Sequence, residues 1–173
     1  MNINELDLSK LNILLIIFLI VALCNASEGY KKGMVKSVIS FVSLIVTCIV
    51  VVLLGNALKS YYDGEIFNVV IMVLLLCVVG LVRHLLGVVF FSAKVLSKLP
   101  IVSWVNKLLG IVFGIFETVL ILWTIYTFIM ILDLGMVAQI ILDNTEESSI
   151  LAWLYQHNYL AYLIEQISSQ VGF

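Results

Sequence analysis

The sequence predicts an all-α, polytopic membrane protein with four transmembrane helices and a C-terminal amphipathic helix. Hydrophobic residues fill 63% of the 173 positions and charged residues only 12%, with a mean hydropathy of +1.20. In a soluble domain, about half of the residues are hydrophobic and about a quarter are charged. The apolar residues gather in four long runs. Continuous rather than alternating hydrophobicity selects helices over barrel strands, the two structures that satisfy the backbone within hydrocarbon.

The first two predicted spans cover residues 8–28 and 34–54. Acidic residues precede the first run and two lysines follow it, which is the reverse of the charge order in a secretory signal. We therefore expect a retained helix. The second run is apolar apart from Lys36 near its start, whose long side chain can reach the interface.

The third and fourth predicted spans cover residues 66–91 and 108–132. The third contains Arg83 in its second half, and the fourth is interrupted only by Glu117. Between them lies a basic loop with Pro100, the single proline of the chain. Because proline lacks an N–H and disfavours helix at the residue before it, we expect a turn there.

Basic residues predict the orientation of the spans. One side of the membrane carries seven of them, Lys31, Lys32, Lys36, Arg83, Lys94, Lys98 and Lys107, and the other side carries two, Lys10 and Lys59. The positive-inside rule places the richer side in the cytoplasm, and therefore both termini outside it. The acidic tail agrees, since no Lys or Arg follows Lys107.

Residues 134–173 form an acidic extracytoplasmic tail beyond the membrane domain of residues 1–133. A polar break ends at Ser148 and Ser149, either of which suits the N-cap of a helix over 150–171. Apolar residues recur in that range at three- and four-residue spacing, which predicts one amphipathic helix. Its aromatic residues suit either the outer headgroup layer or a cap on the bundle.

Composition also excludes several classes of function. With a formal net charge of −2 and only 9 Lys and Arg residues, the chain has no basic field that could hold nucleic acid. Cys24, Cys48 and Cys77 lie inside apolar runs without the spacing of a metal or redox site, and are expected to be small buried hydrophobes. We expect neither a cofactor nor a metal.

Glu117 is the most informative single residue, because it is the one ionisable group inside the fourth span. It lies about 13 Å from the start of that span, near the middle of a hydrocarbon core about 30 Å thick. A carboxylate at this depth faces the bundle interior and is paired, hydrated or neutral. Two interpretations stay open: a functional site, or a protonated glutamic acid that hydrogen-bonds a neighbouring helix.

Two stripes of small and polar residues predict where helices approach each other. Gly110, Gly114, Glu117 and Thr124 follow one face of the fourth span, and Gly33, Ser37, Ser40, Ser43 and Thr47 follow one face of the second. Small residues let helix backbones approach closely, so the two stripes are predicted to pack together. Packing alone explains both stripes, and a polar path that contains Glu117 is the alternative.

Arg83 lies about 25 Å from the outer end of the third span, close to the expected cytoplasmic interface. Its side chain either extends to the headgroups or reaches Glu117 across about 9 Å of depth. His84 follows it, but one histidine without a placed partner is not expected to catalyse a reaction. Since no catalytic motif accompanies it, the chain is predicted not to be an enzyme.

Three motifs follow one another along the chain. The first is Gly29-Tyr30-Lys31-Lys32-Gly33, the second is Leu99-Pro100 with 106–110 and Gly114, and the third combines 147–149 with 158–163. In the first motif the glycines permit a tight reversal and the lysines hold it in the cytoplasm. In this order and spacing, the motifs resemble those of the colicin V production protein family.

This resemblance implies a bacterial inner-membrane protein of four spans that supports colicin V-type peptide toxin production or secretion and envelope homeostasis. Its partners would be the lipid bilayer and other membrane proteins, an export system among the candidates, and self-association is a further alternative. The residues expected to matter most are Gly29, Tyr30, Lys31, Lys32, Gly33, Gly110, Gly114 and Glu117, followed by Arg83, Ser40, Thr47 and Thr124. The alternative function is a small channel or transporter subunit with an ion or proton path at Glu117.

Overall fold

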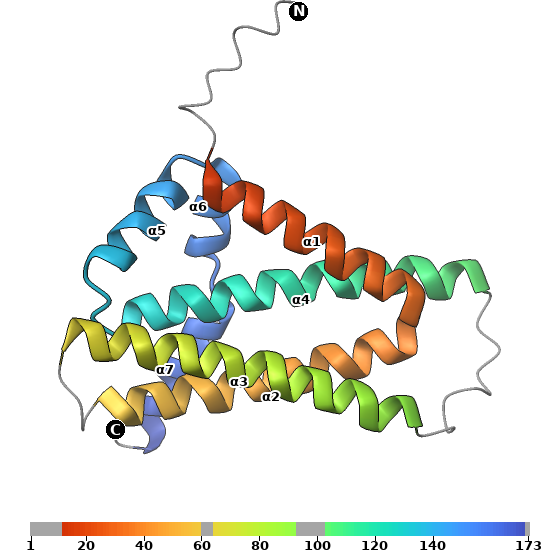
Figure 1. Cartoon of the computed structure of the whole chain (residues 1–173), viewed down its shortest axis with the longest axis horizontal. Helices are drawn as coiled ribbons and strands as arrows, with labels where there is room; N and C mark the ends of the chain where they lie inside the picture. The colour runs from red at the N-terminus through yellow and green to blue at the C-terminus, as the bar shows by residue number, and fades with distance from the viewer. Residues whose placement is uncertain (1–11, 60–63, 93–102, 172–173) are drawn as a thin grey trace, which may run out of the picture.

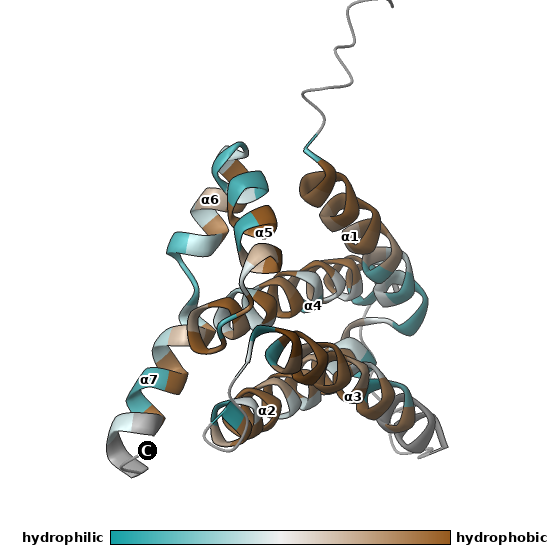
Figure 2. Ribbon diagram, turned by 60° about the vertical axis from the view of Figure 1, so that its left-hand side comes forward, coloured by the Kyte–Doolittle hydropathy of each residue, from teal (hydrophilic) through white to brown (hydrophobic). Residues whose placement is uncertain are grey.

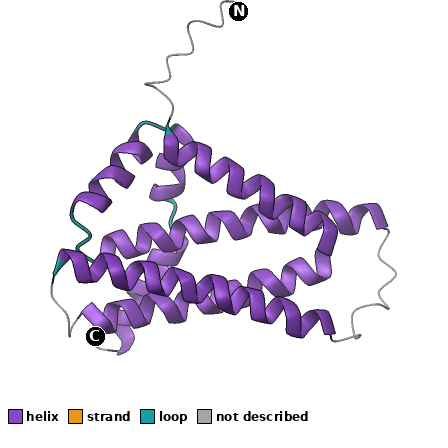
Figure 3. Ribbon diagram, viewed as in Figure 1, coloured by secondary structure: helices purple, strands orange, loops and turns teal. Residues whose placement is uncertain are grey.

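The computed structural model describes residues 12–59, 64–92 and 103–171, which are helical apart from short connections (Figure 3). The helices are α1 (Ile13–Lys32), α2 (Met34–Lys59), α3 (Glu65–Ser92), α4 (Ser103–Ile131), α5 (Met136–Glu146), α6 (Ser149–Gln156) and α7 (Tyr159–Val171). The first four contain stretches long and apolar enough to cross a membrane, which confirms the predicted fold class. The start of the first predicted span and the turn at Pro100 lie outside the described residues.

Helix α4 is the centre of the bundle (Figure 1). Helices α1 and α2 both pack along it, α3 packs mainly on α2, and α5 to α7 gather at the end of the bundle where α4 finishes. The core between α2 and α4 contains Leu44, Val52 and Phe128, and the ring of Phe128 lies against Gly55. These contacts bury one side of α2 and leave its other side outward.

The outward faces of the four long helices are apolar (Figure 2). Leu23 is 71% exposed and Ile66 is 80% exposed, a distribution that suits helices surrounded by lipid. The exposed fractions also correct the expectation that all three cysteines are buried. Cys24 and Cys77 are exposed and only Cys48 is buried, because an apolar run does not distinguish a lipid-facing position from a core position.

The reversal between α1 and α2 takes a single residue. Gly33 has φ 75°, a conformation that a glycine adopts without steric cost, and its N–H donates to the carbonyl of Gly29 at 2.8 Å. The side chain of Asn106 on α4 accepts from the Met34 N–H at 2.8 Å and so caps the start of α2. The predicted turn from Gly29 to Gly33 is therefore corrected: Gly29 itself is helical and belongs to α1.

The tail departs from the single amphipathic helix expected over 150–171. It contains α5, then α6 capped by Ser148, and then α7, with a break at His157 and Asn158. The Asn158 side chain accepts from the Ala161 N–H at 3.1 Å and donates to the Trp123 carbonyl and the Thr127 hydroxyl, both at 3.2 Å. This asparagine interrupts the helix, starts α7 and attaches it to α4, so the tail packs on the bundle.

Replacing Asn158 by alanine is expected to loosen this attachment. The change removes the cap of α7 and leaves the buried Thr127 hydroxyl without this donor, which together should lower the free energy of unfolding by about 1–3 kcal/mol. Thermal unfolding of the purified protein in detergent measures the loss. The matched control is Gln156→Ala, at an exposed position two residues earlier; equal melting temperatures for the two variants would contradict the assigned role of Asn158.

Candidate functional site

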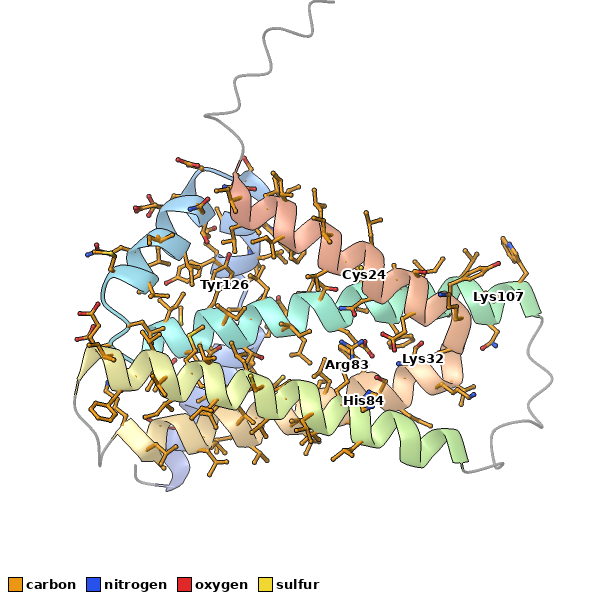
Figure 4. The ribbon with its side chains drawn as sticks, viewed as in Figure 1. Cys24, Lys32, Arg83, His84, Lys107 and Tyr126 are labelled. Atoms are coloured by element: carbon orange, nitrogen blue, oxygen red, sulfur yellow. The ribbon has the colours of Figure 1, made fainter. Side chains whose placement is uncertain are left out.

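Glu117 lies at the midpoint of α4, and its side chain is 4% exposed. The Arg83 guanidinium, carried by α3, donates to its carboxylate in a close ion pair. Figure 4 shows the Arg83 side chain directed from α3 toward α4. Glu117 is therefore inside the bundle, as predicted, with an arginine of α3 as its partner, and a functional role for it stays a prediction.

Arg83 also joins α1 to this pair. Its guanidinium donates to the Asn25 amide oxygen at 3.1 Å and lies 3.5 Å from the Glu28 carboxylate. Its side chain is 19% exposed. Of the two expected positions for Arg83, the structure has the one that reaches Glu117, in which a single side chain bridges α3, α1 and α4.

The network continues in two directions from Asn25 and Glu28. Asn25 donates to the Thr118 hydroxyl of α4 at 2.9 Å. Glu28 pairs with Lys32, one turn further along α1, at 2.6 Å, and both side chains are partly exposed. Two carboxylates and two cations thus extend from the middle of α4 to the end of α1, and their formal charges cancel.

Close approach of α1 and α4 makes this network possible. A Cβ at Gly29 would overlap the Gly110 carbonyl, one at Gly110 would overlap the Gly29 carbonyl, and one at Gly114 would overlap the backbone at Asn25. Helices meet this closely only where both surfaces lack side-chain bulk. The predicted partnership of the two stripes is thus corrected in part: Gly110 lies against Gly33 of the second stripe as well as against Gly29, and Gly114 packs on the backbone of α1. Helix α2 also packs along α4.

The hydroxyl groups predicted to form a polar path mostly bond within their own helices. Thr47 donates to the Ser43 carbonyl and Thr124 to the Leu120 carbonyl, both at 2.8 Å. Ser40 is only partly buried, and Ser37 is buried without a hydrogen-bond partner among the described residues. The structure therefore does not join Ser40, Thr47 and Thr124 to Glu117.

The basic residues of the first motif lie at the end of the bundle shared by α1 and the start of α4. Lys107 lies over the ring of Tyr30, 5.1 Å from its centroid, in a cation–π contact. Lys31 is exposed, and Lys32 pairs with Glu28. These basic residues, which help to predict the orientation of the spans, therefore gather at this end of the bundle.

Asn25 and Glu28 were missed by the sequence analysis. Their spacing of three residues places both on one side of α1, and each precedes Gly29 by at most one turn, which is the signal that could have found them. His84 is exposed on α3, and His157 stacks on Trp153 with centroids 4.4 Å apart. Within the described residues, no group of three or more His, Cys, Asp or Glu side chains could hold a metal ion.

Fold and site together define a multi-pass helical membrane protein with a partly buried ion-pair network across three of its spans. The family model described as colicin V production protein matches residues 14–159, and the chain belongs to this family. The match takes in most of α1, all of α2 to α6, and the whole network. The family is not known as enzymatic. No curated protein and no solved structure matches the chain significantly.

Proposed function

We propose that this protein is a non-enzymatic component of the bacterial inner membrane that supports colicin V-type toxin production or secretion and envelope homeostasis through other membrane proteins. The observation that carries the proposal is the family match over residues 14–159, which includes the membrane helices and most of the tail. Colicin V production is therefore the process in which its membrane domain takes part.

The geometry of the network supports a role that depends on fixed helix positions. Arg83 faces the two carboxylates Glu117 and Glu28 and the amide of Asn25, so its charge is balanced within the bundle. Such an arrangement holds α3 against α1 and α4 and presents their outward apolar faces in a constant geometry. A membrane partner that packs on those faces would recognise this shape by van der Waals contact.

Complementation of a deletion strain tests the proposal. We expect the wild-type gene to restore export of a colicin V-type toxin and resistance to envelope stress. The double variant Lys31→Gln, Lys32→Gln is expected to reduce rescue, because it removes charge from the basic end of the bundle. Membrane levels of each variant are measured by immunoblot. A deletion strain with normal toxin export and normal envelope resistance would overturn the proposal.

Orientation is tested separately. The distribution of basic residues predicts that both termini lie outside the cytoplasm. A phosphatase fused after Phe173, active only outside the cytoplasm, is therefore expected to be active, while a fluorescent reporter that folds only inside should be dark. The matched fusion after Lys59 should behave in the same way, because α2 ends on the same side of the bundle as the tail. The opposite pattern would reverse the orientation.

A proton or ion path is the second candidate function, and one observation favours it. Glu117, Arg83, Glu28 and Lys32 form an unbroken series of charged groups from mid-span to the end of α1. Such series mark proton relays in other membrane proteins. Purified protein in liposomes should then conduct protons or ions, and Glu117→Gln should abolish the flux. Flux no greater than in empty liposomes, from protein with native melting behaviour, would contradict it.

A further inference from the structure

An apolar pocket of about 470 Å³ lies between α1, α4 and α6. Its lining residues are Phe18 of α1, Val119 of α4, and Ser149, Ile150, Trp153 and Leu154 of α6. Ser149 is the only polar residue among these six. The volume falls in the range of roughly 300–1,000 Å³ that is typical of small-molecule sites. The pocket is separate from the ion-pair network, with which it shares no residue.

The pocket follows from the way α6 docks. Helix α1 diverges from α4 toward its own N-terminal end, and α5 and α6 occupy the opening (Figure 1). Leu151 and Leu154 of α6 are buried, and the Trp123 indole donates to the Leu154 carbonyl at 2.8 Å. Ile150 and Trp153, which line the pocket together with Leu154, are each 56% exposed. Helix α6 is therefore fixed to α4 while an apolar space remains beside it.

A hydrocarbon chain is the ligand that matches this lining. Two of the three walls, α1 and α4, belong to membrane spans whose outward faces are apolar, so the pocket is continuous with the lipid-facing surface. Ile17 of α1 and Ile115 of α4 are exposed close to the lining residues in sequence. The pocket is open to the surface, and its lining is almost entirely apolar, so it offers water few hydrogen-bond partners. An acyl chain of the adjacent leaflet is present at high local concentration.

The charge around the pocket selects among lipid headgroups. Glu146 and Glu147 are exposed and directly precede the capping Ser148 and the lining Ser149, and Asp143 lies one turn earlier. No Lys or Arg occurs anywhere between Leu108 and Phe173. This field repels an anionic headgroup and attracts an ammonium group, which can also donate hydrogen bonds to carboxylates.

We propose that the pocket between α1, α4 and α6 binds an acyl chain of phosphatidylethanolamine, whose ammonium group is held by the acidic residues that precede α6. The site would bind the lipid in the leaflet on the α6 side of the bundle. It is independent of toxin production, since it rests on the pocket and on the charge of the tail.

Native mass spectrometry of the full chain tests the proposal. Protein is reconstituted in vesicles of phosphatidylethanolamine and phosphatidylglycerol with matched acyl chains and then extracted in mild detergent. The mass of the protein is measured together with that of the lipid that it retains. We expect one phosphatidylethanolamine per protein, retained in preference to phosphatidylglycerol. Equal retention of the two lipids, or retention of neither, would overturn the proposal.

A pocket-filling variant locates the site. Ile150→Trp places a larger side chain in the pocket from an exposed position, and should reduce lipid retention by about tenfold, the effect of displacing roughly two buried methylene groups. Ile140→Trp, at a similarly exposed position on α5, is the matched control and should retain lipid like the wild type. Equal loss in both variants would contradict the assigned location. A protein dimer that Ile150→Trp disrupts, without retained lipid, would identify a second copy as the occupant instead.

The headgroup is tested by the double variant Glu146→Gln, Glu147→Gln. Both residues are exposed, so the fold should be unaffected. The preference for phosphatidylethanolamine over phosphatidylglycerol should fall toward parity while total retention persists, because the apolar lining is unchanged. An unaltered preference would overturn the role of these carboxylates.

Discussion

Replacing Arg83 by glutamine is expected to lower the free energy of unfolding by about 3 kcal/mol or more, because removing one partner of a buried ion pair leaves the other charge uncompensated. The Glu117 carboxylate, 4% exposed at the midpoint of α4, would lose its cation. Helix α3 would also lose its bridge to Asn25 and Glu28 on α1. Thermal unfolding of the purified protein in detergent measures the effect.

The opposite single variant and the double variant make this prediction specific. Glu117→Gln should lower the free energy of unfolding by less than Arg83→Gln does, since Arg83 keeps Glu28 and Asn25 as partners. The double variant Arg83→Gln, Glu117→Gln should be more stable than Arg83→Gln alone, because it leaves no uncompensated charge in the bundle centre. If the losses of unfolding free energy in the two single variants simply add in the double variant, Arg83 and Glu117 are not energetically coupled. The network then does not hold the helices together.

The same variants separate the two candidate functions. A double variant that regains stability and supports toxin export would show that the pair acts by positioning α3. A double variant that is stable and inactive would instead assign a function to the charges themselves, in agreement with the proton or ion path. This comparison requires equal amounts of each variant in the membrane.

The spans could be predicted because the bilayer imposes a strong and simple constraint. Each of the four apolar runs had to form a helix to satisfy its backbone in hydrocarbon, and each does so within the described residues. Their ends were harder to predict. Helix α1 continues to Lys32, beyond the predicted end at 28, and ends at Gly33, whose φ of 75° reverses the chain.

The candidate site was only half predictable. Glu117 follows from the cost of a charge at mid-depth, which a single sequence reveals. Its partners depend on which face of α1 meets α4, and that is decided by the backbone contact of Gly29 with Gly110. A stripe of small residues shows that a helix approaches closely, but not which one, so the approach of α1 to Gly110 and Gly114 was not predicted.

The break between α6 and α7 coincides with a gap in the apolar repeat, because the positions three and four residues after Leu154 are His157 and Asn158. One such gap is too weak a signal to divide a helix, and Leu154, Leu160 and Ile164 are all buried although they lie in two helices. The cause is the side chain of Asn158, whose partners Trp123 and Thr127 belong to α4. A tertiary contact therefore decides the local structure.

Gly110→Ala is expected to destabilise the protein by about 2 kcal/mol or more, although alanine is the better helix former by about 1 kcal/mol. A Cβ at Gly110 would overlap the Gly29 carbonyl, and backbone cannot move aside as a flexible side chain can. Helices α1 and α4 would have to separate, which would also pull Asn25 away from Thr118 and Arg83. The melting temperature in detergent should therefore fall.

Gly80→Ala provides the matched control and the decisive comparison. Gly80 is exposed in the middle of α3, and a Cβ there would meet no atom within 4 Å. The same substitution should leave stability unchanged or raise it slightly, as helix propensity alone predicts. Opposite signs for the two glycines would show that the α1–α4 contact holds the network together. If Gly110→Ala melts at or above the temperature of Gly80→Ala, the helices do not meet through their backbones, and the bridge from Arg83 to α1 loses its structural basis.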